Sequence, residues 1–207
     1  LGTRNSFFVG IIATLLATAL GTVAALGLSR PHMPFKPVLM AILISPMIVP
    51  LIITAAGMFF FYSKIGLTHT YLGLILAHTA LGTPFVVITV TATLTGFDTN
   101  LIRASQSLGA DTMRTFFKVI MPLILPGVIS GGLFAFITSF DEVVVVMFVG
   151  SVEQITIPKQ MWAGLRQETS PVILCMATCL VALSIALLTT VEMLRRRSER
   201  LRGIKHR

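Results

Sequence analysis

The sequence predicts an all-α membrane protein, a polytopic bundle of helices that crosses the bilayer several times. Of its 207 residues, 55% are hydrophobic and only 12% are charged, which leaves too little polar surface for a soluble domain of this size. The apolar stretches are long enough to cross a hydrocarbon core, which takes roughly 20 helical residues. One polar segment, residues 98–121, interrupts them near the middle of the chain.

Five apolar segments are predicted to span the membrane within a single domain, residues 1–207. They are residues 6–28, 37–62, 71–95, 122–149 and 171–194. The second contains Pro46 and Pro50, which lack backbone donors and would kink or break the helix. Neighbouring helices or a cavity can satisfy the freed carbonyls, so a packing kink and a bend that lines a pathway both remain open. Between the last two segments, residues 151–170 are expected to form a polar loop.

Small residues are placed where helices could meet closely. Ala17 and Gly21 in the first segment, and Gly127 and Gly131 in the fourth, are each four residues apart. A pair with this spacing lies on one face of a helix and lets another helix approach.

Positive charge is concentrated at the C-terminus. The net charge is +8, and seven of the sixteen Lys and Arg residues lie in the last thirteen positions, directly after an apolar segment. This arrangement favours a membrane-flanking basic tail, residues 195–207, which contacts anionic lipid headgroups, over a nucleic-acid partner. With this tail inside the cell, twelve Lys and Arg residues fall on the inner side and four on the outer side. The C-terminus is therefore predicted to be cytoplasmic.

Catalytic and metal-binding motifs are missing from the sequence. Neither Gly-x-x-x-x-Gly-Lys-Ser/Thr nor His-Glu-x-x-His occurs, and no Ser/His/Asp arrangement stands out. The only cysteines, Cys175 and Cys179, make an incomplete metal site and are expected to be packing residues. His78, alone in an apolar segment, is expected to be structural. We therefore predict no catalytic residue, no metal site and no enzyme activity for this chain.

The polar segment 98–121 is predicted to form two short helices at the membrane surface. Asp98, Thr99 and Asn100 offer capping oxygens before the first helix, and Gly109 suits the left-handed turn that ends it. Asp111 can cap the second helix. Helices too short and too polar to span must lie at the surface, where they can dock into a soluble partner.

This segment resembles the cytoplasmic coupling loop, or EAA loop, of permease subunits of bacterial ABC importers. That family shows Glu-Ala-Ala, three residues, a glycine and, about a dozen residues later, Leu-Pro at the start of the next span. Here Arg103-Ala104-Ser105 takes the Glu-Ala-Ala position, Gly109 the glycine and Met121-Pro122 the Leu-Pro. The charge at the first position is reversed. Flanking sequences, including Asp141-Glu142 and its neighbours, are similar to the spermidine/putrescine-type permeases.

The resemblance implies the fold, the partners and the site of this chain. It implies a helical bundle of the ABC importer permease type in the bacterial inner membrane, with a further span upstream of the sequence. A second permease subunit would complete the pathway as a heterodimer, two ABC ATPase subunits would bind ATP and Mg²⁺, and a periplasmic binding protein would deliver the solute. This chain would bind no cofactor itself. The residues expected to contact the ATPase are Arg103, Ala104, Ser105, Gln106, Gly109, Ala110 and Asp111.

Two adjacent carboxylates lie inside the fourth apolar segment, which should break near residues 139–142. Each costs at least ~2.5 kcal/mol near the bilayer centre on insertion scales. At about 1.5 Å per residue, Asp141 lies about 28 Å from Pro122, in the outer half of the bilayer. Either the acids cap a broken helix, or one of them faces a water-filled path and attracts a cation, and we favour the second. The expected pathway residues are Ser139, Phe140, Asp141 and Glu142.

Asp141 and Glu142 favour a polyamine as the solute, because ammonium groups that leave water need compensating negative charge or aromatic faces. Permeases similar to this one carry iron, thiosulfate, opines or amino-acid-like solutes, which remain alternatives. An ion-coupled secondary transporter would also use carboxylates in broken helices. That class is disfavoured because it assigns no role to the surface loop.

Overall fold

The computed structural model describes residues 1–30, 32–96, 98, 100–167 and 171–201. These residues form helices and turns, with no strand among them, which confirms the all-α prediction. The helices are α1 (Gly2–Leu28), α2 (Lys36–Ile48), α3 (Leu51–Ile65), α4 (Tyr71–Thr95), α5 (Asn100–Ser107), α6 (Thr112–Thr115), α7 (Met121–Phe140), α8 (Val144–Val149), α9 (Ile157–Gln167) and α10 (Pro171–Leu201). A π-helical turn, Phe116–Ile120 (η1), joins α6 to α7.

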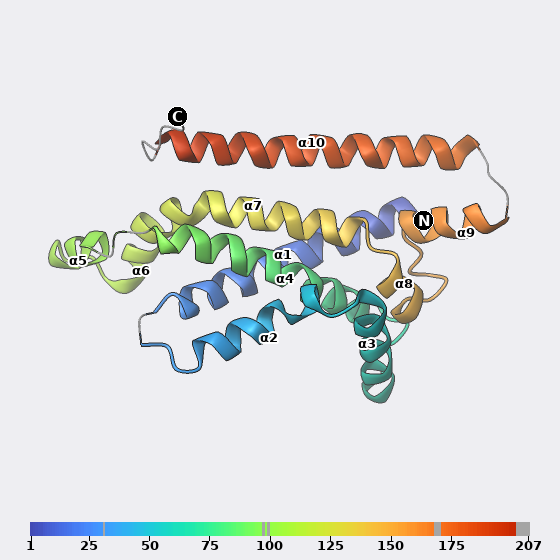
Figure 1. The fold of residues 1–207 in the computed structure, drawn as a ribbon, viewed down its shortest axis with the longest axis horizontal. Coiled ribbons are helices and arrows are strands. Elements are labelled where there is room, and N and C mark those ends of the chain that lie inside the picture. The colour runs from blue at the N-terminus through green and yellow to red at the C-terminus, as the bar shows by residue number, and fades with distance from the viewer. Residues whose placement is uncertain (31, 97, 99, 168–170, 202–207) are drawn as a thin grey trace.

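Helices α1, α4 and α7 pack side by side and form the core of the bundle (Figure 1). A Cβ added at Gly21 of α1 would lie 2.7 Å from the Val86 Cβ of α4. One added at Gly131 of α7 would lie 2.7 Å from the Val86 Cα. Both glycines are therefore required for α1 and α7 to approach the same residue of α4, as the spacing of small residues predicted.

The α2–α3 pair is bent by 105° at Val49 and Pro50. Val49 is extended, at φ −70° and ψ 134°, because the ring of a following proline disfavours helical geometry in the residue before it. The expected span 37–62 is thus two helices. No described side chain of α2 is buried, and α3 buries only Ala55 and Tyr62. The bent pair therefore contributes few buried residues to the core.

A second break separates α7 from α8 at residues 141–143, close to the break expected near 139–142. The segment that follows differs from the prediction. Residues 151–170 were expected to form a polar loop, but α9 occupies Ile157–Gln167. Its polar and apolar residues alternate with helical periodicity, and the low mean hydropathy hid the helix from a search for apolar segments.

The elements at the two ends of the bundle are clearly separated (Figure 1). Helices α5 and α6 lie at one end, where α10 also finishes. The start of α1, together with α8 and α9, lies at the opposite end. Among the described residues, three helical stretches are long and apolar enough to cross a membrane, namely Gly2–Leu28, Tyr71–Thr95 and Thr112–Phe140. The bent α2–α3 pair would make a fourth span, and the apolar part of α10, Leu174–Thr190, is shorter.

Candidate functional site

The polar segment 98–121 folds as two helical pieces around a glycine turn. The Asn100 N–H donates to Asp98 Oδ1 over 2.9 Å at the start of α5. At its end, Gly109 adopts φ +82°. The Gly109 N–H donates to the Gln106 carbonyl and the Ala110 N–H to the Ser105 carbonyl, which is the hydrogen-bond pattern of a Schellman C-cap. No atom approaches within 4 Å of a Cβ built on Gly109, so the backbone angle alone demands glycine there.

The second piece is capped and braced by polar side chains. Asp111 Oδ1 accepts a hydrogen bond of 2.7 Å from the Arg114 N–H, which caps α6 as predicted. The Ser105 hydroxyl lies 2.9 Å from the hydroxyl of Thr115, a residue only 2% exposed. The turn η1 then leads into α7, where Pro122 occupies the first turn. Pro122 has no N–H to donate to the preceding turn, and this missing hydrogen bond favours the wider π-helical geometry of Phe116–Ile120.

Most of the predicted contact residues of this loop are accessible. Arg103, Ala104, Gln106, Gly109 and Asp111 are exposed, whereas Ser105 and Ala110 are half-buried by the brace and the turn.

Exposed apolar side chains lie beside these residues and were not singled out from the sequence. Leu108 is 88% exposed and Met113 is 67% exposed. A large apolar side chain inside a polar surface segment is the signal that could have identified them, because such residues commonly mark protein contacts. The loop therefore presents both charge and apolar surface at its tip.

At the other end of the bundle, the two adjacent carboxylates have different surroundings. Asp141 ends α7 and is exposed. Glu142 is only 6% exposed, and its Oε1 accepts a hydrogen bond of 2.8 Å from the Val145 N–H at the start of α8. From the position before the N-cap residue Val143, Glu142 caps the start of α8 through this hydrogen bond, and of the two acids only Asp141 is exposed.

The two remaining pathway candidates are buried. The Ser139 hydroxyl lies 2.7 Å from His78 Nδ1, which joins α7 to α4. His78 is 1% exposed, and this contact fits the structural role expected of it. Phe140 is 7% exposed and lies between Phe136, in a stacked arrangement, and Phe7, in an edge arrangement. Both residues hold the end of α7 in position beneath Asp141.

A polar network at this same end was missed by the sequence reasoning. Asn5 Nδ2 donates to the backbone carbonyls of Glu153 and Ile155, over 2.7 and 2.9 Å, and Asn5 Oδ1 accepts from the Tyr71 hydroxyl. Lys159 Nζ donates to carbonyls of residues 146, 150 and 151 at the end of α8. Burial lowers the pKa of Lys159. Such contacts join residues up to 150 positions apart, so no local pattern reveals them.

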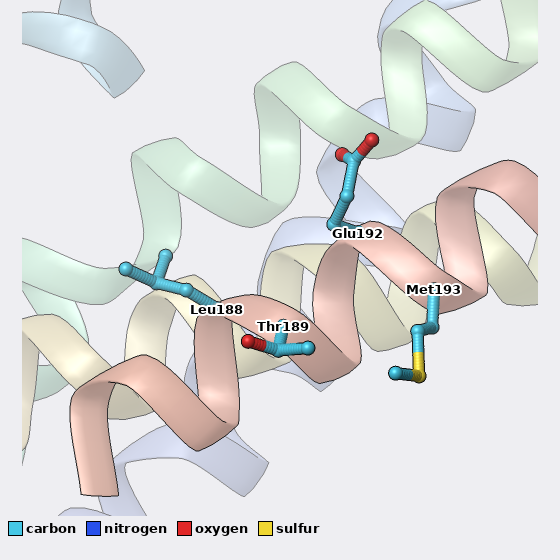
Figure 2. A pocket seen from close by; sticks show the side chains of 4 residues that line it. All are labelled: Leu188, Thr189, Glu192 and Met193. Atoms are coloured by element: carbon cyan, nitrogen blue, oxygen red, sulfur yellow. The ribbon is translucent and has the colours of Figure 1, made fainter. Parts of the chain in front are cut away.

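A hollow of about 420 Å³ on α10 is lined by Leu188, Thr189, Glu192 and Met193 (Figure 2). All four side chains come from this single helix, and the Glu192 carboxylate is the only charged group among them. Within the described part of the chain, no group of three or more His, Cys, Asp or Glu residues could hold a metal ion. We assign no site to this hollow.

Long apolar helices, two broken helices and a capped polar loop at one end define a polytopic membrane transport protein. The chain belongs to the family of binding-protein-dependent transport system inner membrane components, whose model matches residues 17–200. It is the permease subunit of an ABC importer and a multi-pass inner-membrane protein, as its sequence resemblance implied.

Several relatives have named substrates. The chain is 30% identical to the spermidine/putrescine transport system permease protein PotC of Haemophilus influenzae, over 94% of this chain and 76% of that protein. It is 28% identical to PotC of Escherichia coli K12, over 93% of this chain and 73% of that protein. It is also 28% identical to the putrescine transport system permease protein PotI of the same strain, over 85% of this chain and 65% of that protein.

Solved structures support the same fold. The MetNI methionine ABC transporter, in an inward-facing conformation, has a chain that superposes with a TM-score of 0.67 at 20% identity, over 99% of this chain and 95% of that one. A chain of an amino acid ABC transporter with histidines superposes with a TM-score of 0.68 at 16% identity, over 95% of this chain and 92% of that one. At these identities the agreement concerns the fold alone.

Proposed function

We propose that this permease imports polyamines of the spermidine and putrescine class. Its relatives with those names support this class. The structural observation that carries the proposal is the exposed carboxylate of Asp141 at the break between α7 and α8, at the end of the bundle opposite the coupling loop (residues 98–121). An ammonium group that leaves water is stabilised by such a charge. In this proposal Ser139, Phe140 and Glu142 shape the pathway by positioning the break.

The coupling loop would transmit the motion of partner ATPase subunits. Its exposed residues, including Arg103, Gln106 and Asp111, would contact two ABC ATPase subunits that bind ATP and Mg²⁺, while this chain binds no cofactor. The Schellman turn and the Ser105–Thr115 contact would make the loop move as a rigid unit. A loop that binds the two states of the ATPase pair unequally can shift the helices between conformations, whereas one that binds both equally cannot.

The remaining parts of the assembly follow from the same proposal. A second, similar permease subunit would complete the pathway, and a periplasmic binding protein would deliver the solute at the Asp141 end. The coupling loop and the C-terminus would be cytoplasmic. The excess of Lys and Arg in the segments on that side supports this orientation, as does the finish of α10 at the same end as α5 and α6 (Figure 1).

Uptake by the transporter assembled with its cognate subunits in proteoliposomes tests the substrate. Asp141→Asn should raise KM for spermidine by about tenfold, equivalent to about 1.4 kcal/mol. Glu153→Gln is the matched control, because Glu153 is an exposed acid whose backbone carbonyl contacts Asn5 at the start of α1, at the same end of the bundle. Equal KM values in the two variants, or a binding protein that retains a solute without positive charge, would reject the polyamine proposal. Copurification of a stoichiometric ATPase tests the coupling separately.

A further inference from the structure

A pocket of about 360 Å³ lies where the coupling loop meets the ends of α1 and α4. Its volume falls within the range of about 300–1,000 Å³ that is typical of ligand sites. One wall is formed by α1 and α4, through Leu26 and Leu94, and the other by α5, α6 and η1, through Gln106, Thr112 and Phe116. The pocket thus lies between the bundle and the loop, at the end where the polar surface begins.

Its lining is divided into an apolar floor and a polar rim. Leu26, Leu94, Phe116 and Ile120 are half-buried and supply the floor. The rim is made by exposed polar side chains, with Ser29 and Arg30 from the end of α1 facing Gln106 and Thr112 of the loop. A ligand that satisfies both parts must be amphiphilic.

The charge of the pocket is positive. Arg30 is the only charged residue among the described residues that line it. The two acids of the neighbouring loop are engaged in caps, since Asp98 accepts a hydrogen bond from the Asn100 N–H and Asp111 accepts one from the Arg114 N–H. The planar guanidinium of an arginine pairs well with phosphate oxygens. The charged part of the ligand is therefore expected to be an anion.

We propose that this pocket binds an anionic phospholipid from the leaflet on the coupling-loop side. Arg30 would hold the phosphate, Thr112 would hydrogen-bond to the headgroup, and the upper part of an acyl chain would cover the apolar floor. Basic pockets between membrane helices on the cytoplasmic side commonly bind anionic headgroups. A free phosphate offers the same charge but would leave the floor uncovered. The site does not depend on the proposed ATPase-coupling function, because lipid binding is measured without transport.

Native mass spectrometry of the assembled transporter, titrated with short-chain lipids, tests the proposal. Dihexanoyl-phosphatidylglycerol should bind, whereas dihexanoyl-phosphatidylcholine and inorganic phosphate should bind at least about tenfold more weakly. Arg30→Gln should weaken phosphatidylglycerol binding by about tenfold, and Lys36→Gln by less than about twofold. Lys36 is the matched control, because it begins α2 at the same end of the bundle but does not line the pocket.

A second variant covers the case in which Arg30→Gln fails to assemble. Thr112→Trp fills the pocket without removing a charge and should also release the lipid. Equal binding of the two lipids, equal weakening by Arg30→Gln and Lys36→Gln, or full binding by Thr112→Trp would each overturn the proposal. Displacement of phosphatidylglycerol by an equal concentration of inorganic phosphate would overturn it as well, by assigning the pocket to a free anion.

Discussion

The hydroxyl oxygens of Ser105 and Thr115 lie 2.9 Å apart and join α5 to the end of α6 across the Gly109 turn. Thr115 is buried, whereas the neighbouring Ala104 and Leu108 are exposed. The contact therefore fixes the inner side of the coupling loop and leaves its outer side free for a partner. A loop braced in this way can transmit force, because its two helical pieces cannot rotate independently.

Removing this brace should loosen the loop without unfolding the bundle. Ser105→Ala and Thr115→Val should each destabilise the loop locally by about 0.5–1.5 kcal/mol, and the double variant should cost little more than either single one. Hydrogen exchange of the amides of residues 100–115 in the assembled transporter measures the effect. Ser107→Ala is the control, since the Ser107 hydroxyl bonds only to the Arg103 carbonyl within α5. Additive effects of the two substitutions would disprove the brace.

Gly109 should be intolerant of β-branched residues for reasons of backbone geometry. A side chain in the left-handed region costs about 1–2 kcal/mol, and Val would also weaken the Schellman turn. Gly109→Val should reduce spermidine uptake per ATP hydrolysed while membrane insertion stays intact. Gly109→Asn should be milder, because asparagine tolerates this region. Normal uptake by the Val variant would refute the proposed role of the turn.

Asp141 and Glu142 should respond differently to substitution despite being adjacent. Glu142→Ala removes the cap of α8 and should lower stability by about 0.5–2 kcal/mol. Asp141→Ala should leave stability within about 0.5 kcal/mol, because the residue is exposed. Thermal unfolding of the two variants in detergent checks this difference. Equal stability losses would mean that both carboxylates have structural roles.

Gly131 should tolerate no side chain, in contrast to Gly57. A Cβ on Gly131 would collide with the backbone of Val86, so Gly131→Ala should cost about 1–3 kcal/mol as α7 moves away from α4. Nothing lies within 4 Å of a Cβ on Gly57, and Gly57→Ala in the middle of α3 should be neutral or stabilising by up to about 1 kcal/mol. The thermal unfolding midpoints of the Gly131→Ala and Gly57→Ala variants measure this difference in stability. A neutral Gly131→Ala would show that the two helices separate easily.

Much of the fold was predictable because its causes are local. The Asp98 and Asp111 caps, the left-handed Gly109 and the break after Val49 each follow from a residue type acting on backbone within a few positions of itself. The apolar lengths likewise indicate where helices can cross a bilayer. Helix α9 was missed because it is not apolar, so its composition alone resembled that of a loop.

The order of Asp141 and Glu142 in the chain does not reveal which function each of them has. Both are acids next to the same break, and only packing makes Glu142 the buried cap and Asp141 the exposed charge. The Asn5 network likewise depends on contacts between distant segments. Residue type and spacing therefore determine the helices, their caps and the family of this permease. Tertiary packing decides which polar groups remain open to a solute, a lipid or a partner, because burial is a property of the neighbours and not of the residue.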